Sequence, residues 1–136
     1  EGARKRIEAA RDDVAKGLAL ADAGDASARL GRTNSAVGFY LRALRADPTS
    51  EEIVERAATA LHRRPAALEH LLWRHLAAHP WSGDRRPAAV ASLRALAGVY
   101  ERRRRHHTRA QAIEHALEAL GVARPGGPAP AERQQS

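Results

Sequence analysis

The sequence contains no cysteine, and only 4% of its 136 residues are aromatic. The absence of cysteine excludes disulfides, thiolate catalysis and cysteine-ligated zinc. A sheet-based core would need more β-branched and aromatic residues, so abundant alanine favours closely packed helices. No apolar run approaches the roughly 20 residues that span a bilayer, and the first residues lack the apolar segment of a signal peptide. We therefore expect one all-α, cytoplasmic domain without membrane insertion.

The chain has a net charge of +7, and its positive charge is concentrated in one segment. Between Arg85 and Arg109 eight arginines stand against one glutamate, whereas acidic and basic residues balance in the rest of the sequence. We expect one face or end of the protein to be strongly positive. The arginine- and alanine-rich composition is typical of a high-GC bacterial source.

The stretch 31–48 carries the most informative pattern. Gly31 is followed by Ala36, Tyr40 and Ala43 at helical spacing, and Pro48 ends the pattern. Because proline disfavours helical geometry in the residue before it, the spacing predicts a turn followed by a helix over 34–46. Either of two polar residues is suited to cap this helix: Asn34 or Ser35.

This stretch resembles the second half of a tetratricopeptide repeat (TPR), a unit of two helices with apolar or small residues at fixed positions. A 34-residue unit counted back from Pro48 begins at Gly17. Its first four characteristic positions hold Leu20, Ala23, Gly24 and Ser27. The family favours glycine at two of the positions, for close helix contact at Gly24 and for the turn at Gly31. Ser27 departs from the family's large aromatic residue.

A second unit follows directly. Ser50 is suited to cap a helix, two glutamates follow it, and Pro65 suits the first turn of the next helix. The characteristic apolar positions hold Val54, Ala57, Ala58, Leu61, Leu68 and Leu72. The turn-rich residues 81–87 are then expected to protrude as a loop.

The third unit places apolar residues at the same positions. They are Leu93, Leu96, Ala97 and Tyr100 in the first helix and Ile113 and Ala116 in the second. Arg109 departs from the family's alanine, which a terminal unit facing water tolerates.

The resemblance implies an all-α fold of antiparallel helix pairs, stacked as a short right-handed TPR-like solenoid over residues 17–121. The predicted units cover about 17–50, 51–82 and 90–121. Residues 1–16 form either a separate N-terminal helix or an extension of the first repeat helix, with an apolar stripe at Ile7, Ala10, Val14 and Leu18. Residues 122–136 lack apolar periodicity and are predicted to be disordered.

In TPR proteins the first helices of the units line a concave groove that binds a peptide or a helix. Carried over by position, the expected partner-binding residues are Asp25, Arg29, Glu55, Arg56, Thr59, His62, Arg94, Glu101 and Arg102. The arginines among them favour an acidic partner. The lysine and asparagine clamp that some TPR proteins use for a carboxylate is not reproduced, since its positions hold Ala21, Asp25, Arg56, Ala91 and Ala95. The alternative is that these side chains are simply solvated.

A basic patch is predicted at Arg102, Arg103, Arg104, Arg105 and Arg109. It could meet the phosphates of nucleic acid or an acidic protein segment, or it could only stabilise a helix end. Only Tyr100 is close enough in sequence to stack on a base, whereas stacking platforms usually have several aromatics.

Metal binding and catalysis are not expected. His75 and His79 are one turn apart, but a metal needs three or four converging ligands, and we expect scattered surface histidines and no cofactor. No catalytic motif is present. Trp73 is expected in the core or in the packing between repeats, and Trp81 at the base of the loop. The leading hypothesis is a non-enzymatic protein-interaction adaptor; the alternatives are a basic nucleic-acid binder and a self-assembling or accessory domain of a larger protein.

Overall fold

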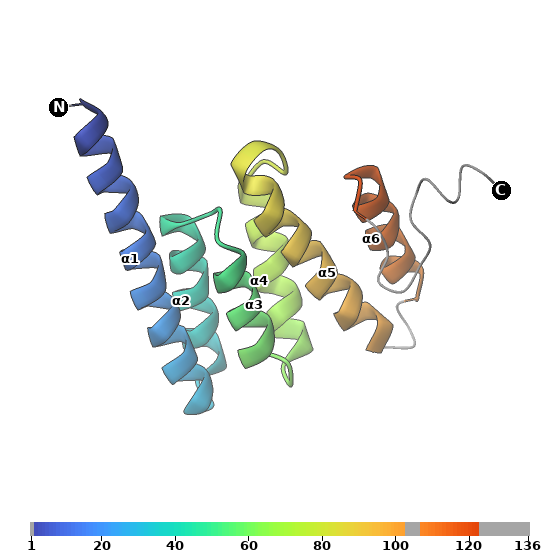
Figure 1. Ribbon diagram of the computed structural model, residues 1–136. Helices are drawn as coiled ribbons and strands as arrows, with labels where there is room; N and C mark the ends of the chain where they lie inside the picture. The colour runs from blue at the N-terminus through green and yellow to red at the C-terminus, as the bar shows by residue number, and fades with distance from the viewer. Residues whose placement is uncertain (1, 103–106, 123–136) are drawn as a thin grey trace. The chain divides into compact units, whose positions relative to one another are not determined.

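The computed structural model describes residues 2–102 and 107–122, and these residues form helices and turns without any strand (Figure 1). The elements are α1 (Gly2–Arg29), α2 (Thr33–Ala46), α3 (Glu51–Ala60), α4 (Pro65–Ala78), the 3₁₀-helix η1 (Gly83–Arg85), α5 (Arg86–Arg102) and α6 (His107–Ala119). The all-α prediction is confirmed. The chain divides into two compact units, residues 1–92 and 93–136, and the division falls within α5. No helix in the described ranges is both long and apolar enough to cross a membrane.

Helix α1 is continuous from Gly2 to Arg29, so residues 3–16 extend the predicted first repeat helix and are not a separate helix. Gly17, which costs roughly 1 kcal/mol of helix propensity, is buried within this helix. A methyl group there would lie 3.1 Å from Cβ of Asp47 and 3.2 Å from Cδ1 of Ile53. The glycine therefore lets α1 pass close to the end of α2 and to α3.

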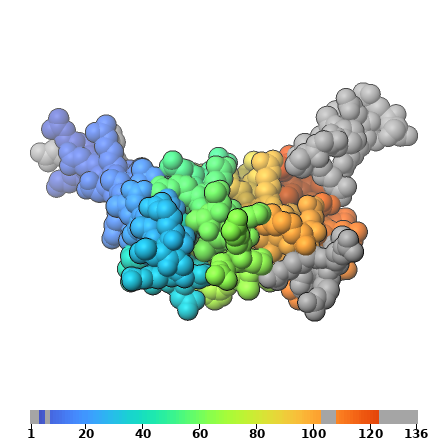
Figure 2. Space-filling view, turned by 90° about the horizontal axis from the view of Figure 1, so that it is seen from below, coloured from blue at the N-terminus to red at the C-terminus, as the bar shows by residue number. Residues whose placement is uncertain are grey.

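The N-terminal turns of α1 project from the first unit, as Figure 2 shows. Ala10 is exposed, Val14 is 46% exposed and Leu18 is half-buried, so the predicted apolar stripe is not buried along these turns. The side chain of Ile7 lies outside the described residues. The physical reason is length: α2 ends at Ala46, beside Gly17, and among the described residues of this unit no helix runs along the earlier turns.

Helices α1 and α2 form an antiparallel hairpin with a glycine at its turn. Gly31 has φ of +74°, a left-handed conformation that glycine adopts without strain. Ala36, Tyr40 and Ala43 are fully buried, as predicted. The close helix contact expected at Gly24 is also confirmed, because a methyl group there would approach Cε1 of Tyr40 to 2.8 Å.

Helices α3 and α4 form the second pair. Ser50 caps α3 as predicted, with its Oγ accepting a hydrogen bond from the Ile53 amide at 3.1 Å, and Pro65 lies in the first turn of α4. The capping prediction for α2 is wrong, since its N-cap is Arg32 and no side chain caps it. The predicted apolar positions are buried except for the half-buried Ala58: Val54, Ala57, Leu61, Leu68 and Leu72.

The two pairs pack with corresponding helices side by side. Helix α1 contacts both α2 and α3, and α4 contacts both α2 and α3. Figure 1 shows α1 and α3 running in the same direction, opposite to α2. One surface of this unit is therefore formed by α1 and α3 together.

The stretch 81–87, which was predicted to be a protruding loop, is largely helical in the structure. It contains η1, and α5 already begins at Arg86. The Trp81 indole Nε1 donates a hydrogen bond to the Leu76 carbonyl at 3.0 Å, so Trp81 covers the end of α4 as expected for the base of a loop. In the compact unit that begins at Leu93, the apolar positions predicted for the third repeat are buried apart from the half-buried Ala116: Leu93, Leu96, Ala97, Tyr100 and Ile113.

Candidate functional site

A groove of about 480 Å³ lies between α1 and α3. Its lining residues come from one face of each helix at helical spacing: Asp25, Ala28 and Arg29 on α1, and Glu52, Glu55, Arg56, Thr59 and Ala60 on α3. Five of the nine predicted partner-binding residues therefore meet here: Asp25, Arg29, Glu55, Arg56 and Thr59.

The other predicted residues lie elsewhere. His62 lines an adjoining hollow at the α1–α2 turn, which shares Ala28, Thr59 and Ala60 with the groove. Arg94, Glu101 and Arg102 are exposed on the part of α5 that belongs to the second unit, as is Arg109 on α6. Of the basic patch, Arg103, Arg104 and Arg105 lie outside the described residues, as does most of the predicted tail at 122–136.

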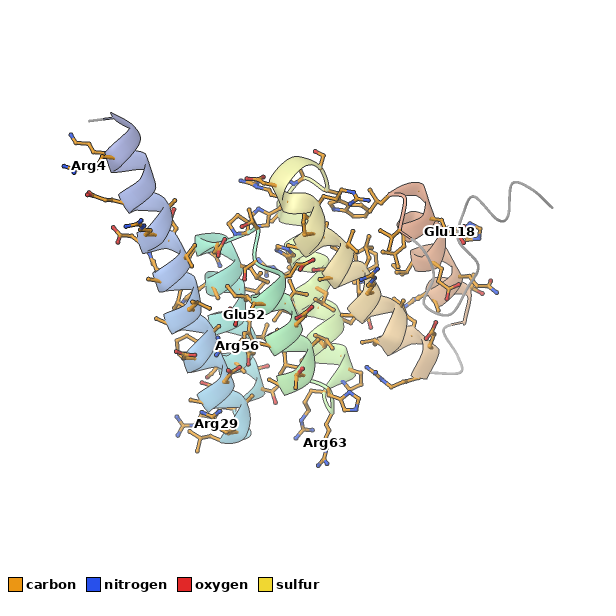
Figure 3. The ribbon with its side chains drawn as sticks, in the orientation of Figure 1. Arg4, Arg29, Glu52, Arg56, Arg63 and Glu118 are labelled. Carbon is orange, nitrogen blue, oxygen red and sulfur yellow. The ribbon has the colours of Figure 1, made fainter. Side chains whose placement is uncertain are left out.

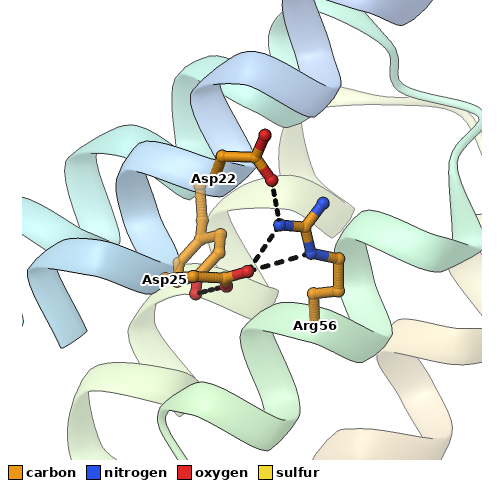
Figure 4. Close-up of polar contacts among 4 residues, drawn as sticks. Asp22, Asp25 and Arg56 are labelled. Atoms are coloured by element: carbon orange, nitrogen blue, oxygen red, sulfur yellow. Dashed lines mark hydrogen bonds and ion pairs between the residues drawn. The ribbon is translucent and has the colours of Figure 1, made fainter. Parts of the chain in front are cut away.

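One arginine joins the two walls of the groove (Figure 4). Arg56 of α3 donates from Nε to Oδ2 of Asp25 at 3.1 Å and from Nη2 to the same oxygen at 2.5 Å. The same Nη2 also lies 2.5 Å from Oδ1 of Asp22. The second oxygen of Asp25 accepts a hydrogen bond from the hydroxyl of Tyr40. A single network of four side chains thus connects α1, α2 and α3.

The pKa values of Tyr40 and Arg56 both lie well above neutral pH. Burial, together with the hydrogen bond to Asp25, raises the pKa of Tyr40, so its hydroxyl remains a donor. The hydrogen bonds to Asp25 and Asp22 raise the pKa of Arg56 above its ordinary value. Arg56 is therefore a permanent cation whose charge already faces two carboxylates.

The lining of the groove carries more acidic than basic groups. Three carboxylates line it against two guanidiniums, one of which is that of Arg56. In Figure 3 Arg29 lies at the lower end of α1, whereas Glu52 and Arg56 lie higher, on α3. Glu52 and Glu55 are both exposed. This surface is therefore acidic at the start of α3.

The prediction that the histidines lie on the surface is wrong for His75. His75 is only 3% exposed, and its Nδ1 has no hydrogen-bond partner. Its ring lies 5.1 Å from that of His79, between centroids. Burial, with a smaller contribution from His79, lowers the pKa of His75 to about 4, and burial and Arg85 lower that of His79. Within the described ranges no three potential ligands gather around a metal position.

The two tryptophans also differ from each other. Trp73 is 39% exposed on α4, so it does not lie in the core, which was one of its two predicted places. Its helix turns the indole outward because Leu71, Leu72, His75 and Leu76 already occupy the buried face. Trp73 instead lines a shallow hollow with Ala66, Glu69, His70, Arg74 and Ala77.

The aromatic residue nearest the basic patch is not available for stacking. Tyr100 is only 2% exposed, and the guanidinium of Arg109 lies 5.8 Å from its ring centroid. A base could not stack on this ring without displacing its neighbours.

Comparisons of the chain with protein-family models, with curated proteins and with solved structures gave no match. The site is therefore interpreted from its own geometry. Sequence reasoning placed Asp25 and Arg56 on the groove but missed their ion pair and its link to Tyr40. The only available signal was the spacing of Asp22 and Asp25, which puts two carboxylates on one helical face.

Proposed function

We propose that this chain is a non-enzymatic protein-interaction module of the TPR type, which binds a peptide or helix of a partner protein in the groove between α1 and α3. The observation that carries this proposal is that five of the nine residues assigned to partner binding by the TPR resemblance line one groove. The adjacent packing of α1 with α3 and of α2 with α4 is the arrangement that stacked repeats require.

The groove has room for a chain segment because its lining includes small side chains. Ala28 and Ala60 lie on opposite walls, with the exposed Thr59 beside them. The network around Arg56 holds the walls together before any partner arrives. A preorganised groove loses less conformational entropy on binding, which favours affinity.

Tyr40 and Arg56 are not suited to proton transfer near neutral pH. A general acid or base works best with a pKa near the working pH. The pKa values of Tyr40 and Arg56 are both raised from ordinary values that already lie well above neutrality. These two groups are therefore suited to holding the helices together.

Selection of random peptides displayed on phage tests the proposal. Thr59→Trp fills the groove from an exposed position, so it should leave the helical circular dichroism unchanged and abolish binding of most peptides selected on the wild type. Gln111→Trp, at an exposed position on α6, is the matched control and should retain them. Selected peptides that bind both variants equally would show that the groove is not the binding site.

A further inference from the structure

We propose that the segment bound in this groove carries a lysine or arginine side chain, held between Glu52 and Glu55 at the start of α3. This inference rests on the proposed function and names the chemistry of the partner. It reverses the acidic partner that the arginine-rich composition suggested.

Arg56, which lines the groove, is already paired with carboxylates. Arg56 gives two hydrogen bonds to Asp25 and one to Asp22, and its side chain is 25% exposed. Two carboxylates thus compensate one guanidinium, and the network leaves no excess of positive charge. An acidic ligand would meet Asp22, whose side chain is 73% exposed, as soon as it approached Arg56.

Two glutamates of α3, Glu52 and Glu55, line the groove close to each other. Glu52 and Glu55 are three residues apart on one helix, so their side chains lie on the same face about 5 to 6 Å apart at Cβ. Both line the groove and both are exposed. Within the described part of the chain neither forms a hydrogen bond or an ion pair. A primary ammonium or a guanidinium from a ligand can reach both carboxylates at once.

Glu52 and Arg29 lie towards opposite ends of the groove. The Arg56–Asp25 pair sets the register between α1 and α3, which run in the same direction. Glu52 lies four residues before Arg56, and Arg29 four residues after Asp25, so each is about 6 Å from the pair along its helix, in opposite directions. Arg29 therefore lies away from Glu52, at the opposite end of the groove.

The positive net charge of the protein disfavours cationic ligands, so their selection would be a demanding test of the acidic site. At +7, non-specific attraction would enrich acidic ligands, in particular on the arginine-rich segment 85–109. Enrichment of cationic peptides can only come from a local acidic site.

The test sequences the peptides selected from an unbiased random phage library on the wild-type chain. We expect lysine and arginine to be enriched among peptides that Thr59→Trp loses. The double variant Glu52→Gln/Glu55→Gln should bind a synthesised selected peptide about tenfold more weakly. The control Glu8→Gln/Glu51→Gln makes the same charge change at exposed positions that do not line the groove, and should bind within about twofold of the wild type.

The outcomes separate this inference from the proposed function. Groove-dependent peptides enriched in aspartate or glutamate would overturn the cationic ligand and leave the binding module intact. Equal weakening by both double variants would also overturn it, because the effect would then come from net charge. Failure to select any peptide that depends on Thr59 would remove the proposed function, and this inference with it.

Discussion

Gly24 of α1 lies directly against the ring of Tyr40 of α2. A methyl group at Gly24 would come within 2.8 Å of Cε1 and 2.9 Å of Cζ, closer than real side chains pack. The ring cannot retreat freely, because it is fully buried and its hydroxyl is bonded to Asp25 on α1. This contact sets the distance between the two helices, and hence the position of the wall that carries Asp25.

Gly24→Ala should therefore destabilise the protein. We expect a loss of about 1 to 3 kcal/mol in the free energy of unfolding, since the methyl group overpacks a rigid site. Urea denaturation followed by circular dichroism measures it. Gly38→Ala is the control: a methyl group at Gly38, within α2, meets nothing within 4 Å. That change should stabilise the protein by about 0.5 to 1 kcal/mol, and a similar effect at both sites would refute the packing argument.

Arg56→Met should destabilise the first unit by about 1 to 3 kcal/mol, because Asp25 would lose two charge-assisted hydrogen bonds at a largely covered site. A double-mutant cycle with Asp25→Asn should give a coupling of at least about 1 kcal/mol. Arg29→Met, at an exposed groove position, should change stability by less than about 0.5 kcal/mol. Additive effects of the Arg56 and Asp25 changes would mean that their ion pair contributes nothing to stability.

The sequence was most informative where local rules and burial agree. Ala36, Tyr40 and Ala43 identified the buried face of α2, and Pro48 marked its end, because period and helix termination depend on neighbours in sequence. Contacts between helices were less predictable. Asp25 and Arg56 are 31 residues apart, and helical period assigns each to a face without saying which side chains across that face will meet.

Helix capping offers a direct comparison of one correct and one incorrect prediction. Ser50→Ala removes the hydrogen bond to the Ile53 amide and should cost about 1 kcal/mol. Ser35→Ala removes a hydroxyl that caps nothing, at an exposed position in the first turn of α2, and should change stability by less than about 0.5 kcal/mol. Chemical denaturation of both variants measures the difference. A larger loss for Ser35→Ala would contradict the observed start of α2.

His75 should make the fold sensitive to acid. Its pKa falls from 6.5 to about 4 on burial, so folding favours the neutral ring. This contribution is fully present above pH 6.5 and is lost as the pH falls towards 4, by about 3 kcal/mol in all. His75→Leu should remove that part of the pH dependence, whereas His70→Leu, at an exposed position on the same helix, should follow the wild type. Parallel stability curves for wild type and His75→Leu would contradict the assignment.

The errors in the sequence analysis share a cause. A residue four positions from another can be buried or exposed depending on which neighbouring helix covers its face, and periodicity does not specify the neighbour. His75 was expected at the surface, and Trp73 in the core or between repeats because Leu72 and Leu76 are near it in sequence. The packing of α4 on α2 and α3 instead buries His75 and leaves Trp73 39% exposed.

The most direct test of the central claim is an amide chemical-shift map of the ¹⁵N-labelled chain titrated with a peptide selected on it. We expect the largest shifts at the groove residues Asp25, Arg29, Glu52, Glu55 and Thr59, and we expect Thr59→Trp to abolish them. Shifts confined to α5 and α6, or unchanged by Thr59→Trp, would contradict a binding groove between α1 and α3.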